Sequence, residues 1–590
     1  MNHHPRHAPV KNTCLKIRVI KKLVPEMPLF PRDLARLNTE FPSQGLVWLL
    51  ALVFVFAGLG NPGISDNNEG LYAEIAREML MSHDWRHWVI PHLNGLPYME
   101  KPPLLYWLTA LSFALFGIAE WPARLVPAIS ALSCVAMMLR FGNAVQRTLA
   151  GRLGALMFIT GLGVSIMSRL LMFDMLLTAC LTGALLNGYR HFTEGSPAQL
   201  RRSMVWLGLA VLSKGMVALL LYLLVVGGFL FSVAGFGGTF LRAIGRMMRL
   251  DALALLVAIV LPWHVTASVI EPLFPWFYFV NEHVLRFLGK REPHDYYSGP
   301  AWYYLPRIML YLFPWSMFVL GLLDRQQPLP AAGSATLRRF LFLAWLLPLA
   351  FFSISRAKAN YYLVVVMPFA ALHLAVGLEN RGLRRPALTV WPGCAVAILA
   401  AALCLTIWLR QEDTDRPLQI FHTSLGMPLL AAFAAIGLLG LLCSLLARSF
   451  AIGMKAYLML PVAVGAMIYS VVMAMQPLTT TKPLARWLQR EASGYKIFLY
   501  RSFEDISSLP FYMEQPLPIV DSRSRDLLWG ARLKPNTLMH SDNEFDAIVQ
   551  SQGRIAIVVT DRQLQAFRTR PYAARLQERK HMGRLTVFMN

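Results

Sequence analysis

The chain has 590 residues, of which 56% are hydrophobic and 15% are charged, and its formal net charge is +23. This composition excludes an ordinary soluble domain, and the repeated apolar runs near 20 residues are typical of helices that cross a bilayer. The basic residues stand in short clusters between those runs, which indicates membrane topology and excludes a nucleic-acid-binding protein.

Residues 1–44 form a polar arm rich in Lys and Arg, which is expected to stay in the cytoplasm. The first apolar run, 45–60, has no convincing cleavage site and is expected to remain as a membrane anchor. It would deliver the charged stretch DNNEGLYAEIAREM, 66–79, to the outer face.

The next segment, 61–121, is predicted to be a first external loop, with one ambiguous apolar run at 103–118. Two prolines at its start and a length of only ~16 apolar residues favour a helix that lies in the membrane interface. This interpretation also places the basic loop at Arg140, Arg147 and Arg152 in the cytoplasm.

Charge then alternates along the rest of the apolar part and predicts thirteen spans, with a second large external loop at 269–302. The spans are expected near 45–60, 122–141, 150–168, 172–189, 203–213, 216–235, 250–268, 303–323, 339–354, 360–378, 389–409, 427–447 and 455–475. The region 203–235 could also be one long helix, which would invert every later loop.

The tail, 477–590, has a different pattern and is predicted to be a small external α/β domain. Strand-like runs stand at 496–501, 555–561 and 584–589, separated by helix-like segments such as FDAIVQSQ and RQLQAFRTRPYAARLQER. No Gly-rich phosphate loop is present, so no nucleotide role is assigned to it.

Several cations fall on the predicted outer side, which the positive-inside pattern does not explain: Lys101, Arg169, Lys214, Arg286, Arg356 and Lys358. Such charges near span ends are costly, so they indicate either a function or side chains that reach to lipid headgroups. Gathered on one face, they would suit a phosphate group.

Two other polar positions stand out. Asp174 lies in an apolar run, where it needs a partner, and Arg169 is one candidate for a structural ion pair. His283, beside Glu282 in NEHVLRF, could bind metal or phosphate, although it lacks the spacing of a strong metal motif.

Between residues 45 and 475, a series of motifs resembles one family of membrane enzymes. NEGLYAEIAREM, PHLNGLPYMEKPPLLYW, SKG, NEHVLRF, WYYLPRIMLYLFPW and SRAKANYYLVVVMPF occur in matching order. Together they resemble the 4-amino-4-deoxy-L-arabinose lipid A transferase family, integral membrane glycosyltransferases related to protein O-mannosyltransferases.

The resemblance implies a polytopic α-helical membrane protein with the GT-C fold. About thirteen transmembrane helices, interfacial helices in the first periplasmic loop and a small C-terminal periplasmic α/β domain are expected. The implied domains are the basic arm (1–44), the transmembrane catalytic domain (45–476) and the periplasmic domain (477–590).

The resemblance also implies an inverting transfer of a sugar from a polyprenyl-phosphate donor to lipid A at the periplasmic face of the bacterial inner membrane. Such a reaction gives resistance to cationic peptides such as polymyxin. Other acceptors remain open, namely another glycolipid or glycan, or protein Ser/Thr as in a protein O-mannosyltransferase, and a flippase of lipid-linked sugar is a further alternative. The protein is expected to act as a monomer.

Family residues carry over to this chain one by one. The implied phosphate ligands are Lys101, Lys214 and Arg286, the implied pocket residues are Tyr72, Tyr98, Tyr361 and Tyr362, and the implied ligands of a divalent metal such as zinc are Glu100 and His283.

The chain departs from the family at its proposed catalytic motif, D-E-x-R-Y. Asn68 and Leu71 stand where the family has Asp and Arg, while Glu69 and Tyr72 are kept. Either Asp66 or Glu69 is therefore expected to supply the catalytic carboxylate, unless the acceptor differs. Asp174 is expected to position the residues of the first loop or a lysine.

Overall fold

The computed structural model describes residues 41–294, 298–321, 334–380, 387–409, 426–446, 450–534, 538–551 and 553–590. The basic arm predicted at 1–44 lies outside the described residues except for its last four. The helices of the apolar part that precede the second loop are α2 (Gln44–Phe56), α6 (Leu125–Ala144), α7 (Thr148–Thr160), α8 (Leu162–Met167), α9 (Phe173–Glu194), α10 (Pro197–Lys214), α11 (Met216–Ala234), α12 (Gly238–Met247) and α13 (Leu250–Ile270).

The second loop and the later apolar helices follow in the same chain order. They are η3 (Trp276–Leu285), η4 (Ala301–Tyr303), α14 (Tyr304–Tyr311), η5 (Trp315–Met317), α15 (Phe318–Gly321), α16 (Ser334–Ile354), η6 (Asn360–Val366), α17 (Met367–Asn380), α18 (Ala387–Leu409), α20 (Gly426–Leu446), α21 (Phe450–Tyr457), α22 (Met459–Ala474) and α23 (Gln476–Thr479).

Within the described residues, six helical stretches are long and apolar enough to cross a membrane: 125–144, 216–234, 250–270, 335–354, 360–380 and 452–474. Five shorter apolar helices accompany them, including the first anchor α2 and the expected interfacial helix at 104–116. The chain is thus a multi-pass α-helical membrane protein, and the count of thirteen spans stays a prediction.

The ambiguous region 203–235 consists of two helices and not one. The helix α10 ends at Lys214, and Gly215, with φ of +86°, separates it from α11. A positive φ ends the α-helical hydrogen-bond pattern, so the chain turns at this glycine. The break leaves Lys214 at the end of its helix.

The charged stretch that follows the first anchor forms a buried helix, α3 (Asn68–Met81). Its Glu74 and Arg77 are buried and paired at 2.7 Å, which explains how charges are accommodated inside the fold. The rest of the first loop forms η2 (Trp85–Trp88), β1 (His92–Leu93), β2 (Leu96–Pro97), α4 (Leu104–Phe116) and α5 (Glu120–Ala123).

A six-stranded sheet forms the C-terminal unit, in the order β5-β4-β3-β6-β8-β7. Its elements are α24 (Lys482–Glu491), β3 (Lys496–Tyr500), η8 (Glu504–Ile506), α25 (Ser508–Met513), β4 (Ile519–Val520), α26 (Leu528–Leu533), β5 (Met539–His540), α27 (Asp542–Gln550), β6 (Ile555–Thr560), α28 (Asp561–Arg568), η9 (Pro571–Arg575), β7 (Gln577–Met582) and β8 (Leu585–Met589). Strands β5, β4, β3 and β6 are parallel, while β8 is antiparallel to β6 and β7. The predicted α/β character and the three predicted strands are confirmed.

One helix-like segment of the tail is only partly helical. The prediction for 562–579 is wrong beyond Arg568, where α28 ends, because Pro571 opens a 3₁₀ turn and β7 begins at Gln577. This last part is an edge strand with polar side chains, so its pattern lacks the apolar alternation of a half-buried strand.

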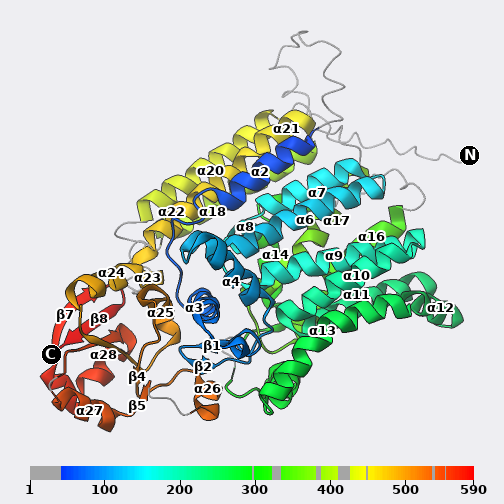
Figure 1. Ribbon diagram of the computed structural model, residues 1–590. Coiled ribbons are helices and arrows are strands. Elements are labelled where there is room, and N and C mark those ends of the chain that lie inside the picture. The colour runs from blue at the N-terminus through cyan, green and yellow to red at the C-terminus, as the bar shows by residue number, and fades with distance from the viewer. Residues whose placement is uncertain are drawn as a thin grey trace, which may run out of the picture. The chain divides into compact units, whose positions relative to one another are not determined.

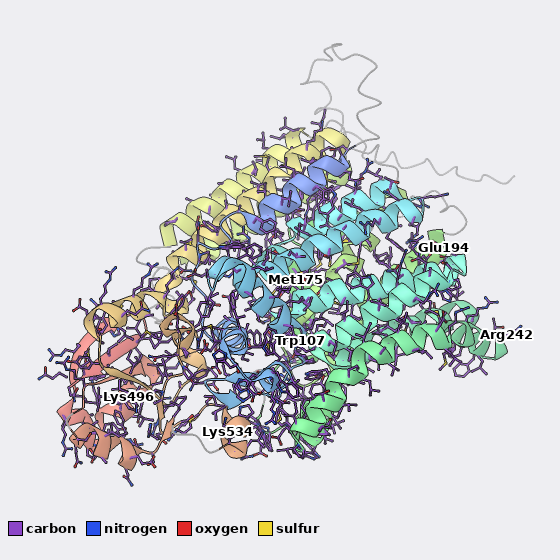
Figure 2. The ribbon with its side chains drawn as sticks, in the orientation of Figure 1. Trp107, Met175, Glu194, Arg242, Lys496 and Lys534 are labelled. Carbon is purple, nitrogen blue, oxygen red and sulfur yellow. The ribbon has the colours of Figure 1, made fainter. Side chains whose placement is uncertain are left out.

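The C-terminal unit packs against the first loop (Figure 1). Asp66 N–H donates to Thr479 O at 2.8 Å, and Asn67 N–H donates to Glu504 O at 3.0 Å. A Cβ on Gly70 of α3 would lie 2.7 Å from Ser508 N, so only glycine allows this close approach. In Figure 2, Glu194 and Arg242 lie at the end of the helices away from this unit, which holds Lys496.

Candidate functional site

The three cations predicted to bind phosphate line a single cavity of about 770 Å³. Lys101 comes from the segment before α4, Lys214 is the last residue of α10, and Arg286 follows η3. These positions are up to 185 residues apart in the sequence, yet the fold brings all three together. Their phosphate-binding role stays a prediction.

The walls of this large cavity are mostly apolar, which is compatible with a hydrocarbon chain. The apolar lining includes Phe173, Leu177, Leu220, Leu223, Phe287 and Phe351. The predicted site residues Tyr72, Glu100, Asp174, His283, Tyr361 and Tyr362 line it as well. The large cavity therefore joins an apolar wall to a group of charged side chains.

Lys214 is held by one carboxylate and two aromatic rings. Its Nζ forms an ion pair with Asp174, and it lies 4.5 Å from the ring centre of Tyr362 and 5.4 Å from that of Tyr361. The contacts with the two rings are cation–π interactions. The arrangement fits the expected positioning role of Asp174.

The suggested pairing of Asp174 with Arg169 is wrong. Arg169 precedes the start of α9 at Phe173, so the two side chains do not share a helical face. Its Nε donates instead to the Phe54 carbonyl at 2.9 Å.

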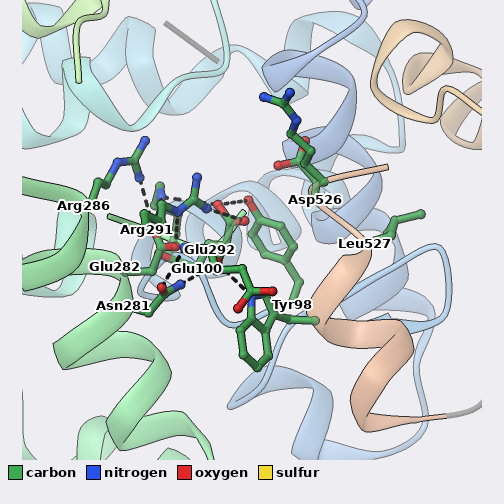
Figure 3. A network of polar contacts seen from close by, with 12 residues as sticks. Tyr98, Glu100, Asn281, Glu282, Arg286, Arg291, Glu292, Asp526 and Leu527 are labelled. Carbon is green, nitrogen blue, oxygen red and sulfur yellow. Dashed lines mark hydrogen bonds and ion pairs between the residues drawn. The ribbon is translucent and has the colours of Figure 1, made fainter. Parts of the chain in front are cut away.

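Lys101 and Arg286 belong to a network that centres on the buried carboxylate of Glu282 (Figure 3). Glu282 Oε2 lies 3.1 Å from Arg286 Nη1 and 3.7 Å from Lys101 Nζ. Arg291, itself buried, contacts Glu282 at 2.5 Å and Glu100 at 2.7 Å. Burial alone would raise the pKa of Glu282, but the nearby cations, Arg291 most of all, lower it to about 2.

A π-helical segment and a return loop position this network. Within η3, Asn281 Nδ2 donates to Glu292 O at 2.8 Å, and Glu292 N–H donates back to Asn281 Oδ1 at 3.0 Å. This pair of bonds folds the chain so that Arg291 returns to Glu282 ten residues after η3 presents it. Single π-turns of this kind are frequent at functional sites.

The residues predicted to hold a metal do not present a ready metal site. His283 Nδ1 donates to Tyr278 O at 2.6 Å, and its Nε2 accepts from Met216 N–H at 3.1 Å, so both ring nitrogens are engaged. Glu100 is paired with Arg291. Across the described part of the chain, no group of three or more His, Cys, Asp or Glu side chains could hold a metal ion. The metal stays a prediction, and no chemical step is derived from it here.

A smaller cavity of about 90 Å³ shares a wall with the large one. The shared residues are Tyr72, Glu100, Lys101, Arg286, Ala357, Tyr361 and Tyr362. Its other lining residues are polar for the most part and include Tyr98, Asn67, Asn68, Glu504 and Asp526. Asn68 and Leu71, where the chain departs from the family motif, both line this smaller cavity.

The two carboxylates predicted to be catalytic line neither of these cavities. Asp66 accepts hydrogen bonds from the backbone and hydroxyl of Ser508, at 2.9 and 2.7 Å, and from Arg584 at 2.8 Å. Burial raises its pKa to about 6, although the charge of Arg584 opposes that shift.

Glu69 is bound more tightly still. Arg124 donates to its two oxygens at 2.8 and 3.0 Å, and Ser65 and the backbone of Leu171 also donate to them. Burial acts to raise the pKa of Glu69, but Arg124 outweighs it and the pKa is lowered. Glu69 lines a separate apolar cavity of about 500 Å³ near α2 and α22. The catalytic role of both carboxylates stays a prediction.

Sequence reasoning missed two charged residues of the site, Arg291 and Asp526. Arg291 lies in the predicted second loop, next to Lys290 in a basic pair, a pattern that could have drawn attention to it. Asp526 lies in the C-terminal unit, 425 residues after Lys101, and its sequence surroundings, SRDLLWG, contain no recognisable motif.

Comparisons with known proteins agree with this architecture. A family model described as dolichyl-phosphate-mannose-protein mannosyltransferase matches residues 100–266. The crystal structure of ArnT from Cupriavidus metallidurans bound to undecaprenyl phosphate has a TM-score of 0.77, covers 93% of this chain and 98% of that chain, and is 23% identical. This likeness confirms the predicted fold.

Curated relatives carry the name undecaprenyl phosphate-alpha-4-amino-4-deoxy-L-arabinose arabinosyl transferase. Transferase 1 of Sodalis glossinidius is 32% identical over 374 residues, 58% of this chain and 62% of the relative. With that relative and two others, from Aeromonas hydrophila and Pseudomonas fluorescens, the match spans only 55–62% of the relative's length. The transferase of Pseudomonas paraeruginosa is 30% identical over 412 residues, and the match covers 66% of this chain and 70% of that protein. At this identity and coverage, the chain belongs to the aminoarabinose arabinosyl transferase family.

Proposed function

We propose that the protein is a glycosyltransferase that moves 4-amino-4-deoxy-L-arabinose from an undecaprenyl-phosphate donor to lipid A. The reaction would take place at the periplasmic face of the bacterial inner membrane, with the C-terminal unit, 477–590, in the periplasm. Modified lipid A would carry less negative charge and would bind cationic peptides such as polymyxin less well.

One observation carries this proposal: Lys101, Lys214 and Arg286 line the same cavity as a wall of apolar side chains. A polyprenyl-phosphate sugar has a hydrocarbon tail and a monoanionic phosphodiester. The apolar wall suits the tail, and the cations suit the phosphate. An ArnT of the same fold has been crystallised with undecaprenyl phosphate.

The proposed reaction is a displacement at the anomeric carbon with inversion. The bond from that carbon to the phosphate oxygen breaks, its electron pair leaves with the polyprenyl phosphate, and an acceptor oxygen forms the new bond on the opposite face. Charge grows on the leaving phosphate, so cations placed beside it lower the barrier. Neutralising this charge is the role proposed for Lys101, Lys214 and Arg286.

An anionic acceptor fits the state of the predicted carboxylates. Asp66, Glu69 and Asp174 are each engaged with a cation, which leaves them poorly suited to accept a proton. A phosphate group of lipid A is already a nucleophile and releases no proton. A hydroxyl acceptor, by contrast, requires a base.

Sugar transfer can be tested with the purified full-length protein in liposomes that contain the aminoarabinose donor and lipid A. Mass spectrometry should detect modified lipid A together with free undecaprenyl phosphate in equal amounts. Lys101→Ala should lower the rate about 100-fold, because a charge-assisted contact with the leaving group is lost. Lys496→Ala, an exposed lysine of the C-terminal sheet, is the matched control and should keep full activity.

The mannosyltransferase match over 100–266 favours one alternative, transfer to protein Ser/Thr. Replacing lipid A by a Ser/Thr-rich peptide in the same liposomes distinguishes the two acceptors. Glycopeptide without modified lipid A would contradict the proposed acceptor. Movement of intact donor across the bilayer, with no free undecaprenyl phosphate, would indicate a flippase and would overturn the enzyme proposal.

A further inference from the structure

Asp526 differs from the other carboxylates around the two cavities. Glu100, Asp174 and Glu282 each have a cation within ion-pair distance. For the Asp526 side chain, the described part of the chain offers neither an ion pair nor a hydrogen bond, although it lines the smaller cavity. An unpartnered carboxylate on a cavity wall is available to a ligand.

The backbone at Asp526 is held firmly even though its side chain is not. Glu504 Oε1 accepts hydrogen bonds from the Ser524 hydroxyl at 2.6 Å and from the backbone N–H groups of Arg525 and Asp526, at 2.7 and 3.1 Å. The helix α26 starts two residues later, at Leu528. Glu504 therefore acts as a positioning residue that fixes where Asp526 stands.

Asp526 lies beside the network of Glu100, Glu282 and Arg291, on the segment that leads into α26 (Figure 3). Burial, together with the nearby carboxylates Glu100 and Glu504, raises its pKa well above the usual value. A positive ligand group in the smaller cavity would relieve this repulsion and keep the carboxylate ionised. The surroundings of Asp526 therefore favour a cationic ligand.

The two cavities lie in the order that a donor lipid requires. The apolar wall of the large cavity comes first, Lys101 and Arg286 stand on the wall that both cavities share, and the polar smaller cavity follows. A polyprenyl-phosphate sugar has the same sequence of parts: hydrocarbon, phosphate, sugar. With the phosphate at the shared wall, the sugar would enter the smaller cavity.

We infer that the smaller cavity is the subsite for the transferred sugar and that the Asp526 carboxylate binds the sugar's amino group. The inference rests on the proposed function, because it takes the sugar to be an aminopentose, the sugar named for the relatives. Asp526 is then a specificity-determining residue that the C-terminal unit contributes to a site built mainly by the helical part. Protonated amine and carboxylate form a charge-assisted hydrogen bond.

The test compares two donors that differ only at the amino group. One is undecaprenyl-phosphate 4-amino-4-deoxy-L-arabinose, and the other carries a hydroxyl at that position, which is similar in size but uncharged. The wild-type protein should transfer the amino sugar at least 10-fold faster at limiting donor. Asp526→Asn should reduce this preference to about 2-fold or less by slowing the amino donor alone, and Asp526→Glu should restore part of it.

The ratio between donors is measured within one preparation, so a lower fraction of folded protein cancels. Asp561→Asn, an exposed carboxylate of the same unit, is the control and should leave the ratio unchanged. An unchanged ratio in Asp526→Asn, an equal loss with both donors, or a wild-type protein that does not discriminate would each overturn the inference. A wild-type protein that transfers neither sugar would instead contradict the proposed function itself.

Discussion

The cations of the large cavity and the carboxylates of the first loop are both charged groups buried near the ends of apolar helices, but their surroundings differ. Lys101 and Arg286 share carboxylates with each other and keep contact with an open cavity. Asp66 and Glu69 are enclosed by donors that satisfy them completely. A charge beside a cavity can meet a ligand, whereas a fully satisfied one holds the fold.

The largest effect expected from this comparison is on stability, at Glu69. Glu69→Ala would leave the buried Arg124 guanidinium without its carboxylate, at a cost of about 3–5 kcal/mol in the free energy of unfolding. Thermal unfolding in detergent, followed by tryptophan fluorescence, should show a strongly lowered midpoint. Glu491→Ala, an exposed acidic residue at the end of α24, should change the midpoint little.

An undiminished midpoint in Glu69→Ala combined with complete loss of sugar transfer would reverse the assignment. Glu69 would then be a catalytic residue, as the sequence analysis expects, and not part of the scaffold.

The next effect concerns Arg291, which neutralises Glu282 and Glu100 and so leaves Lys101 and Arg286 available to a ligand. Arg291→Ala would turn those carboxylates toward the two cations and weaken phosphate binding. The rate of transfer at limiting donor should fall about 10–100-fold, equivalent to about 1.4–2.7 kcal/mol. Arg532→Ala, which removes an exposed pair with Glu292 in the same region, should have almost no effect.

The difference between Arg291 and Arg532 also shows how far the sequence alone can lead. Spans, strands and the converging cations followed from hydrophobic period, charge placement and motif resemblance, because each of these is recorded locally in the chain. Ion-pair partners are not recorded locally. Asp66 meets Arg584, 518 residues away, and Asp526 reaches a cavity formed by helices hundreds of residues earlier.

The same limit explains the error at Asp174. Arg169 is its nearest cation in sequence, but α9 begins between them, and Lys214 arrives from the end of α10. Only the break at Gly215, which a sequence could also present as one continuous helix, places that lysine correctly.

A smaller effect is expected from Gly215→Ala, which tests whether this break positions Lys214. A Cβ at this position would lie 2.6 Å from Tyr278 Oη and 2.7 Å from His283 Nε2, and the φ of +86° is strained for alanine. The backbone strain costs roughly 1–2 kcal/mol, so donor KM should rise and the unfolding midpoint should drop modestly. Gly227→Ala within α11 has no atom within 4 Å and should stabilise the protein slightly. Equal behaviour of the two variants would contradict a special role for the break.

The smallest predicted effect is a pH dependence that isolates Asp66. Its folded pKa of about 6 lies above the ordinary value of 3.8, so between these values the folded state binds more protons than the unfolded state. Stability contributed by this group therefore falls as pH rises through 6, and it increases by roughly 1 kcal/mol between pH 7 and pH 5. Asp66→Asn cannot titrate, so the difference in unfolding midpoint between wild type and variant should shift toward the wild type at pH 5. A difference that stays constant, or that shifts toward the variant, would mean that Arg584 and Ser508 outweigh burial and keep the carboxylate charged, as Arg124 does for Glu69.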